Sequence, residues 1–297
     1  SGRVKSLSGD GPVRAELADG RTINADAGVA ATNVPSPISN WVAVYTKMAP
    51  YRSYVVAFDA RAGSVRDALV WDMEDPYHYV RIQPAGERDI VIVGGADHKA
   101  GHGPGDGKSP FAQLEAWARE RYPGLGVVTH HWSGQVSEPV DGVAFIGRVP
   151  TGGHGACYAI TGDSGMGMTH GTLGAMLVAD LIRGRENPWT GVYDPDRGPA
   201  KGVGEFVREN LDAAGTLREY LTPGEARSAD DVAPGAGALV RDGLRKLAVY
   251  KDPQGTVHRC SAVCPHLKCI VRWNETEASW DCPCHGSRFD AYGRWIM

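Results

Sequence analysis

Alternating apolar and polar residues predict a β-meander at the start of the chain. The segment Val13–Leu17 alternates, Asp19-Gly20 is a typical turn pair, and residues 21–24 resume an extended pattern. Residues 28–33 then form a short apolar run that ends in polar side chains. This pattern is typical of a buried strand that stops beside a ligand.

The next part of the chain predicts a sheet and one amphipathic helix. Three segments have the apolar runs of sheet strands, namely residues 51–58, 77–83 and 89–94. Ser109-Pro110 is a typical helix start, because a capping residue is followed by proline in the first turn. Leu114 and Trp117 contribute to a single apolar face, and Pro123-Gly124 ends the helix.

A glycine-rich turn leads into a second helix. Residues 162–171 read Gly-Asp-Ser-Gly-Met-Gly-Met-Thr-His-Gly, and the sequence then stays apolar nearly all round as far as about Arg183. Such a helix is predicted to be buried. Its first N–H groups and partial positive charge suit an anionic or electron-rich ligand. A glycine-rich turn that serves packing alone is the alternative.

Together these patterns predict that strands and helices both occur in the first two thirds of the chain. A length of 297 residues suggests two domains. The net charge is −4 and the basic residues are scattered, so no nucleic-acid footprint is present. No apolar run approaches the roughly 20 residues of a transmembrane helix.

Five of the six cysteines lie in the last 38 residues, which indicates a metal site rather than a disulfide-stapled secreted domain. Cys264 and His266 are followed, after fifteen residues, by Cys282 and His285. Two thiolates and two imidazoles on two loops fit an iron–sulfur cluster with cysteines on one iron and histidines on the other. Electron transfer is therefore the leading functional hypothesis.

The ligand types suit this chemistry. Thiolates are soft donors for sulfide-bridged iron. Neutral imidazoles remove negative charge and raise the potential to about −150 to +300 mV, against about −400 mV for plant-type all-cysteine clusters. Structural zinc is the alternative, since Zn²⁺ also binds Cys and His. The chain has no Cys-x-x-Cys knuckle, which disfavours zinc.

The two motifs, Cys-x-His-Leu-x-Cys and Cys-Pro-Cys-His-Gly-Ser, resemble the Rieske 2Fe–2S domain in the subtype with an extra cysteine pair. The resemblance covers residues 222–297. It implies a disulfide between Cys269 and Cys284, and places Leu267 and Ser287 in the shell around the cluster.

Phe289 departs from the Rieske pattern. In such domains the loop serine, here Ser287, and a tyrosine two residues later donate hydrogen bonds to the cluster. The chain has phenylalanine at the second place. We therefore expect a lower potential than in respiratory-chain Rieske proteins, because one donor is missing.

Four blocks of the remaining sequence, residues 31–33, 132–135, 139–148 and 162–171, resemble the C-terminal part of FAD-dependent oxidoreductases of the D-amino-acid/glycine oxidase (DAO) family. The resemblance covers about residues 1–190 and implies that the glycine-rich turn packs on the flavin. Backbone N–H groups at its pyrimidine edge would favour flavin reduction. The implied FAD contacts are Thr32, Asn33, Gly162, Ser164, Gly165, Met166, Gly167, Met168 and Thr169.

The Gly-x-Gly-x-x-Gly fingerprint of the family, which binds the pyrophosphate, does not occur in the chain. We therefore expect a fragment, with its FAD-binding first half upstream of Ser1 and the Rieske domain cut after Met297. The two resemblances together imply an α+β fold, in which a mixed-sheet part is followed by a small antiparallel β domain. The expected division is a partial DAO-like domain at 1–190, a linker at 191–221 and the Rieske domain at 222–297. FAD is then expected in the intact parent protein.

The resemblance implies a flavin-dependent oxidoreductase that oxidises a C–N bond of an amine or amino acid. Electrons would pass through the cluster to or from an unknown partner, since a flavin links two-electron to one-electron chemistry. No catalytic base is identified, and a cytoplasmic location is expected. Two alternatives remain open: a Rieske electron-transfer module without enzyme activity, and a zinc-stabilised binding protein.

Overall fold

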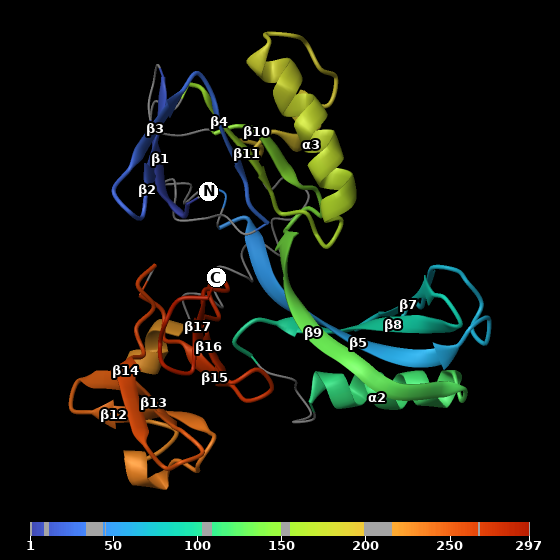
Figure 1. Cartoon of the computed structure of the whole chain (residues 1–297). Helices are drawn as coiled ribbons and strands as arrows, with labels where there is room; N and C mark the ends of the chain where they lie inside the picture. Colours follow the sequence, from blue (N-terminus) through green and yellow to red (C-terminus); the bar gives the residue numbers. More distant parts are fainter. Residues whose placement is uncertain are drawn as a thin grey trace. The chain divides into compact units, whose positions relative to one another are not determined.

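The computed structural model describes residues 2–8, 12–33, 44, 46–102, 109–149, 155–198, 216–266 and 268–296 (Figure 1). The helical elements are α2 (Pro110–Arg121), α3 (Gly167–Ile182), α4 (Thr190–Tyr193) and the 3₁₀ turns η1 (Thr216–Tyr220) and η2 (Ala229–Asp231). The strands are β1 (Val4–Ser8), β2 (Val13–Leu17), β3 (Thr22–Ala25), β4 (Gly28–Ala31), β5 (Met48–Arg61), β6 (Val70–Trp71), β7 (His78–Ala85), β8 (Arg88–Lys99), β9 (Leu125–Pro139), β10 (Phe145–Arg148), β11 (Cys157–Thr161), β12 (Gly237–Asp242), β13 (Arg245–Lys251), β14 (Val257–Ser261), β15 (Arg272–Asn274), β16 (Ser279–Asp281) and β17 (Arg288–Asp290).

The chain forms two compact units. The first unit consists of Ser1–Pro50 and Val136–Gly215, and the second consists of Tyr51–Gln135 and Thr216–Met297. Each unit therefore combines segments that are far apart in the sequence. The division predicted from the sequence, at residues 190 and 221, separates consecutive stretches of the chain, whereas each compact unit combines two separate stretches. That division stays a prediction.

The first unit holds the predicted meander, β1-β2-β3, and a small mixed sheet, β10-β11-β4. Strand β11 runs parallel to β4 and antiparallel to β10, which confirms the mixed-sheet part of the α+β prediction. Helix α3 lies along this sheet (Figure 1). Its residues Leu177 and Val178 pack against Ile146 and Tyr158 in an apolar cluster.

The prediction that this helix is buried all round is wrong for the described residues. Met168 is 89% exposed, and Met176 and Ile182 are also largely exposed. Only one side of α3 meets the sheet, where Gly174 lets the backbone approach Ile160. A Cβ atom on Gly174 would lie 2.9 Å from that side chain. Apolar composition alone does not tell which faces of a helix are covered.

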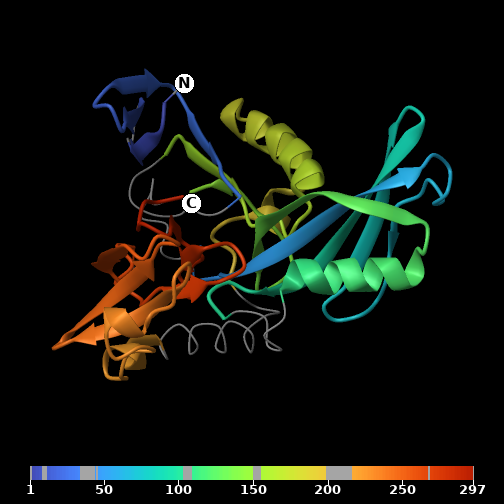
Figure 2. The ribbon, with the colours of Figure 1, turned by 60° about the horizontal axis from the view of Figure 1, so that its bottom comes forward.

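The larger sheet of the second unit has the order β6-β7-β8-β5-β9, and α2 covers one of its faces (Figure 2). Leu114 and Ala118 of α2 are fully buried in the same apolar cluster as Phe58 and Val91 of the sheet. The Ser109-Pro110 start and the single apolar face predicted for this helix are thus confirmed.

The last part of the second unit is all β apart from short 3₁₀ turns. It contains two three-stranded antiparallel sheets, β12-β13-β14 and β15-β16-β17. Trp273 of β15 stacks on Tyr250 of β13, with ring centroids 5.4 Å apart, and joins the two sheets. This arrangement confirms the predicted small antiparallel β domain. It also places the two cysteine–histidine segments beside the second sheet, before β15 and before β17.

An ion pair in the first unit leads to a pH-dependent prediction. Arg197 donates to both carboxylate oxygens of Asp141, at 2.7 and 2.9 Å, and both side chains are mostly buried. Burial alone would raise the pKa of Asp141, but the hydrogen bonds and the charge of Arg197, together with backbone hydrogen bonds, outweigh burial and lower this pKa. The pair's stabilisation is therefore complete above the unfolded-state pKa of about 3.9, and is lost as pH falls through the lower folded-state value.

Arg197→Met should consequently lower the free energy of unfolding by about 2–3 kcal/mol at pH 7, and by clearly less at pH 2–3. Urea unfolding at the two pH values measures the difference. Arg21→Met is the matched control, because Arg21 pairs with Asp19 on the exposed surface of the same unit. It should change little at either pH. An equal effect of Arg197→Met at both pH values would contradict the prediction.

Candidate functional site

The two cysteine–histidine segments form loops with the same backbone hydrogen bonds. In the first loop, residues 264–269, the N–H of the first residue, Cys264, donates to the carbonyl of the sixth, Cys269 (2.8 Å). The N–H of the fifth residue, Lys268, donates to the carbonyl of Cys264 (3.1 Å). The second loop, residues 282–287, repeats both bonds at 2.8 and 3.0 Å. The fifth position is left-handed in both, with φ +63° at Lys268 and +72° at Gly286. Cys264 and Cys282 therefore hold equivalent first positions.

A disulfide between Cys269 and Cys284 ties the two loops together. Both half-cystines are buried. The pairing implied by the Rieske resemblance is thus confirmed. Because the bond uses two of the four loop cysteines, it leaves Cys264 and Cys282 as thiols.

The remaining two thiols meet across the loops. The side chains of Cys264 and Cys282 are both buried and hydrogen-bonded to each other. The hydrogen bond to Cys264, together with burial, raises the pKa of the Cys282 thiol well above its ordinary value. Two soft sulfur donors are thereby held side by side and away from solvent.

The two histidines also meet across the loops. The rings of His266 and His285 lie edge to face, with centroids 5.0 Å apart. Burial lowers the pKa of His266. Burial, and then the charge of His266, lower the pKa of His285 to about 4. Both shifts favour the neutral imidazole, which is the form that binds metals.

This donor set fits a Rieske cluster. It offers one cysteine and one histidine from each of two loops that have matching backbone folds, as two thiols and two neutral imidazoles. Zinc would need the same four groups around one ion. The Cys269–Cys284 disulfide removes the other two loop thiols from the donors open to a zinc ion. The ligand assignment to Cys264, His266, Cys282 and His285 stays a prediction.

The residues predicted to surround the cluster have different outcomes. Leu267 lies outside the described residues. The Ser287 carbonyl accepts the N–H of Cys282, and the predicted role of its hydroxyl stays a prediction. Phe289 pairs with Trp280 in the β16–β17 ladder and lines a cavity of about 230 Å³ together with Cys260.

A segment that no sequence motif marks contacts the first loop. Tyr220, at the end of η1, donates its hydroxyl to the carbonyl of Lys268. Its neighbour Glu219 accepts a hydrogen bond from Arg272 at 2.6 Å and pairs with the buried Lys246. Glu219 and Tyr220 lie in the predicted linker, residues 191–221. No motif marked them, because single polar residues carry no spacing pattern.

The two segments predicted to contact FAD meet in the first unit. The Thr161 hydroxyl and the Gly162 N–H both donate to the carbonyl of Asn33, at 3.0 and 3.3 Å. The end of β4 therefore lies beside the start of the glycine-rich turn. The hydroxyl oxygen of Thr32 is buried, and within the described ranges it has no hydrogen-bond partner.

The turn itself has a left-handed backbone. Gly162, Ser164 and Gly165 have φ values of +67°, +53° and +74°. Ser164 donates its hydroxyl to the carboxylate of Glu138, which holds this unusual conformation in place. The N-cap residue Met166 makes no side-chain capping bond, and residues 165–169 are exposed. The N-terminus of α3 thus presents its first backbone N–H groups to a ligand.

A cavity of about 130 Å³ lies between the strand ends and the turn. Asn33, Thr161, Asp163, Gly167 and His170 contribute to its lining. Sites for whole ligands usually measure about 300–1,000 Å³, so this cavity can hold only one edge of a flavin. The exposed N–H groups and the buried Thr32 oxygen suit such an edge. The individual FAD contacts stay predictions.

Comparison with known protein families gives two matches. The family "FAD dependent oxidoreductase" (DAO) matches residues 1–181, and the family "Rieske [2Fe-2S] domain" matches residues 223–297. The two matches together cover both candidate sites, the glycine-rich turn and the cysteine–histidine loops.

Individual relatives agree with these matches. The Bacillus subtilis (strain 168) protein YhfW, named as a Rieske 2Fe-2S iron-sulfur protein, is 29% identical over 82% of this chain and 47% of its own length. The cytochrome b6-f complex iron-sulfur subunit of Synechococcus sp. (strain WH7803) is 30% identical over 39% of this chain and 63% of its own. The crystal structure of glycine oxidase from Geobacillus kaustophilus superposes with a TM-score of 0.54 at 18% identity, covering 66% of this chain and 52% of that one. The chain spans about half the length of YhfW and of the glycine oxidase.

Proposed function

The chain belongs to the FAD dependent oxidoreductase (DAO) family and continues into a Rieske [2Fe-2S] domain, and from this premise we propose that it oxidises a C–N bond of an amine or amino acid and passes the electrons through a 2Fe–2S cluster. The substrate class takes its support from the DAO resemblance. Proteins of the same fold carry the names glycine oxidase and L-proline dehydrogenase. The partner that takes or supplies single electrons belongs to the same proposal.

The observation that carries the proposal is the pairing of like side chains, thiol with thiol and imidazole with imidazole, across two loops with matching hydrogen bonds. Cys264 meets Cys282, and His266 meets His285, while the disulfide holds the loops together. These four side chains would hold the cluster. Residues 32–33 and 162–169 would hold the pyrimidine edge of FAD, with the N–H groups of α3 directed at it.

When bound, FAD would supply the two-electron oxidation of a C–N bond, and the 2Fe–2S cluster would supply one-electron transfer. The residues of this chain supply orientation and charge. The N-terminus of α3 stabilises negative charge that develops beside it. Burial of the two thiols keeps water from the sulfur donors, and neutral imidazoles keep the total charge of the ligand set low.

The proposal is tested on anaerobically purified full chain supplied with FAD. Visible absorption and electron paramagnetic resonance report the cluster, and fluorescence quenching reports FAD binding. A panel of amines and amino acids is then added under anaerobic conditions. Reduction of the cluster by an amine, and not by the corresponding 2-hydroxy acid, is the expected result. A cluster that no amine reduces in FAD-loaded protein, but that a chemical reductant does, would favour a non-enzymatic electron-transfer module. A colourless protein that contains zinc would refute both.

The Phe289 departure yields a second testable expectation. Phe289→Tyr should raise the midpoint potential by about 60–130 mV, because one added hydrogen bond to a charged group contributes about 1.5–3 kcal/mol. A redox titration followed by paramagnetic resonance measures the shift. Phe289→Met is the matched control, since it keeps an apolar side chain without a donor and should not raise the potential. A tyrosine variant with the same potential as the methionine variant would contradict the expectation.

In the described ranges of the chain, none of the helices combines the length and the apolar character that crossing a membrane requires. A cytoplasmic location is part of our proposal. Cell fractionation with an antibody to the full chain tests it.

A further inference from the structure

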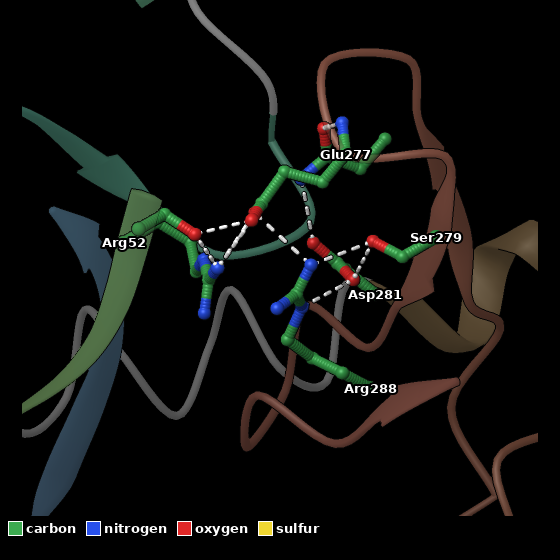
Figure 3. A network of polar contacts seen from close by, with 7 residues as sticks. Arg52, Glu277, Ser279, Asp281 and Arg288 are labelled. Atoms are coloured by element: carbon green, nitrogen blue, oxygen red, sulfur yellow. Dashed lines mark hydrogen bonds and ion pairs between the residues drawn. The ribbon is translucent and has the colours of Figure 1, made fainter. Parts of the chain in front are cut away.

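A buried ion pair joins the large sheet to the Rieske domain inside the second unit. Arg52 of β5 is only 2% exposed, and its Nη2 atom lies 2.8 and 2.6 Å from the two carboxylate oxygens of Glu277 (Figure 3). Ser133 of β9 contacts the same two groups, accepting from Arg52 and donating to Glu277. Glu277 thus contacts two strands of the large sheet, through residues that precede it by 225 and 144 positions in the sequence.

The ion pair continues into the Rieske domain as a network. Arg288 of β17 donates to Glu277 at 3.0 Å and to Asp281 at 2.9 Å (Figure 3). Asp281 is 1% exposed and directly precedes Cys282, the first residue of the second loop. Two cations and two carboxylates therefore alternate from the sheet to the edge of the loop, and each buried charge has an opposite neighbour.

Such a network is energetically different from an exposed salt bridge. A solvated surface pair contributes little, because water and salt screen it and two long side chains lose freedom. Here Arg52 is desolvated, and its guanidinium meets both oxygens of one carboxylate. Loss of Glu277 would leave the buried guanidinium of Arg52 without its carboxylate partner, which is costly for a buried charge.

A second contact lies beside the second loop. Gly101, just after β8, has φ +74°, and a Cβ atom built there would lie 2.8 Å from the Cα of Pro283. Pro283 stands between Cys282 and Cys284 and is itself buried. The backbone at Gly101 thus packs directly on the second loop, which carries half of the candidate cluster ligands. Only glycine at this position leaves room for Pro283.

We infer that the large sheet carries a docking surface for the chain's own Rieske domain, on which Arg52 holds Glu277 and Gly101 receives the second loop. Arg52 is then a positioning residue, since it acts on the loop through Glu277 and Arg288. That the docked loop serves electron transfer rests on the proposed function. The docking itself does not depend on it, and the experiment below separates the two.

Amide hydrogen exchange of the full chain tests the docking. In Arg52→Met, exchange at residues 282–287 should rise about tenfold, although the substitution is on the sheet. In Glu277→Gln, exchange at residues 99–102 should rise by a similar factor, although the substitution is in the Rieske domain. The double variant should exchange no faster than either single variant, because the two residues act as one pair. Arg119→Met is the matched control, since Arg119 pairs with Glu115 on the exposed surface of α2.

A pair of glycine variants tests the second contact. Gly63 has φ +72°, nearly the same as Gly101, but a Cβ atom there would meet nothing within 4 Å. Gly63→Ala and Gly101→Ala therefore share the backbone strain and differ in the contact with Pro283. Gly101→Ala should raise exchange at residues 282–287, and Gly63→Ala should not.

Effects confined to the substituted side, or additive effects in the double variant, would overturn the docking surface. The variants could change exchange on the opposite side of the contact while no amine reduces the FAD-loaded protein. That result would support the docking surface and refute the proposed function.

Discussion

Replacing Cys264 with serine should abolish the paramagnetic resonance signal of the reduced cluster. Cys264 and Cys282 hold the equivalent first positions of two matched loops, and their buried thiols touch. A serine hydroxyl is a harder and much less acidic donor than a thiol, so it does not replace a thiolate on sulfide-bridged iron. We expect loss of the signal and of bound iron and sulfide, measured on the same purified sample.

Cys260→Ser is the matched control for this prediction. Cys260 lies in β14, outside both loops, and its sulfur is directed at the carbonyl of Ala248 at 3.8 Å. The serine variant should keep the full signal and the full iron content. A signal that survives in Cys264→Ser, or that disappears in Cys260→Ser, would refute the ligand assignment.

Periodicity predicted the elements that depend on local sequence. Strands β2, β4, β5, β7 and β8 and helix α2 lie where alternation, apolar runs and the Ser109-Pro110 start placed them. For these elements the physical cause lies within a few residues of its effect, so a single sequence contains it. The pairing of Cys269 with Cys284 spans 15 residues and came instead from the resemblance to the Rieske domain.

The parts that could not be predicted depend on contacts between distant residues. Nothing near Arg52 in the sequence indicates Glu277, since an arginine in a strand is usually solvated at its end. Tyr220 likewise gives no sign of reaching the first loop. The exposed side of α3 was missed for a related reason: its residues are apolar all round, so only the position of the sheet decides which of them are buried.

Arg288→Met should lower the free energy of unfolding by about 3–5 kcal/mol, the cost of breaking a buried ion pair from one side. The guanidinium of Arg288 lies 2.9 Å from Asp281 and 3.0 Å from Glu277, and it also donates to Ser279 at 2.8 Å. Its removal leaves the deeply buried carboxylate of Asp281 with neutral donors alone, from Ser279 and Asn274. Urea unfolding at neutral pH, followed by tryptophan fluorescence, measures the loss.

Two variants separate charge burial from lost packing. Arg119→Met removes an arginine from an exposed pair with Glu115, in which both side chains are 41% exposed, and should cost less than about 1 kcal/mol. The double variant Asp281→Asn, Arg288→Met removes both charges and should recover part of the loss, because no uncompensated carboxylate remains at that position. If Arg288→Met costs no more than Arg119→Met, the charge network contributes little to the Rieske domain. If the double variant is less stable than the single one, packing rather than charge explains the effect of Arg288.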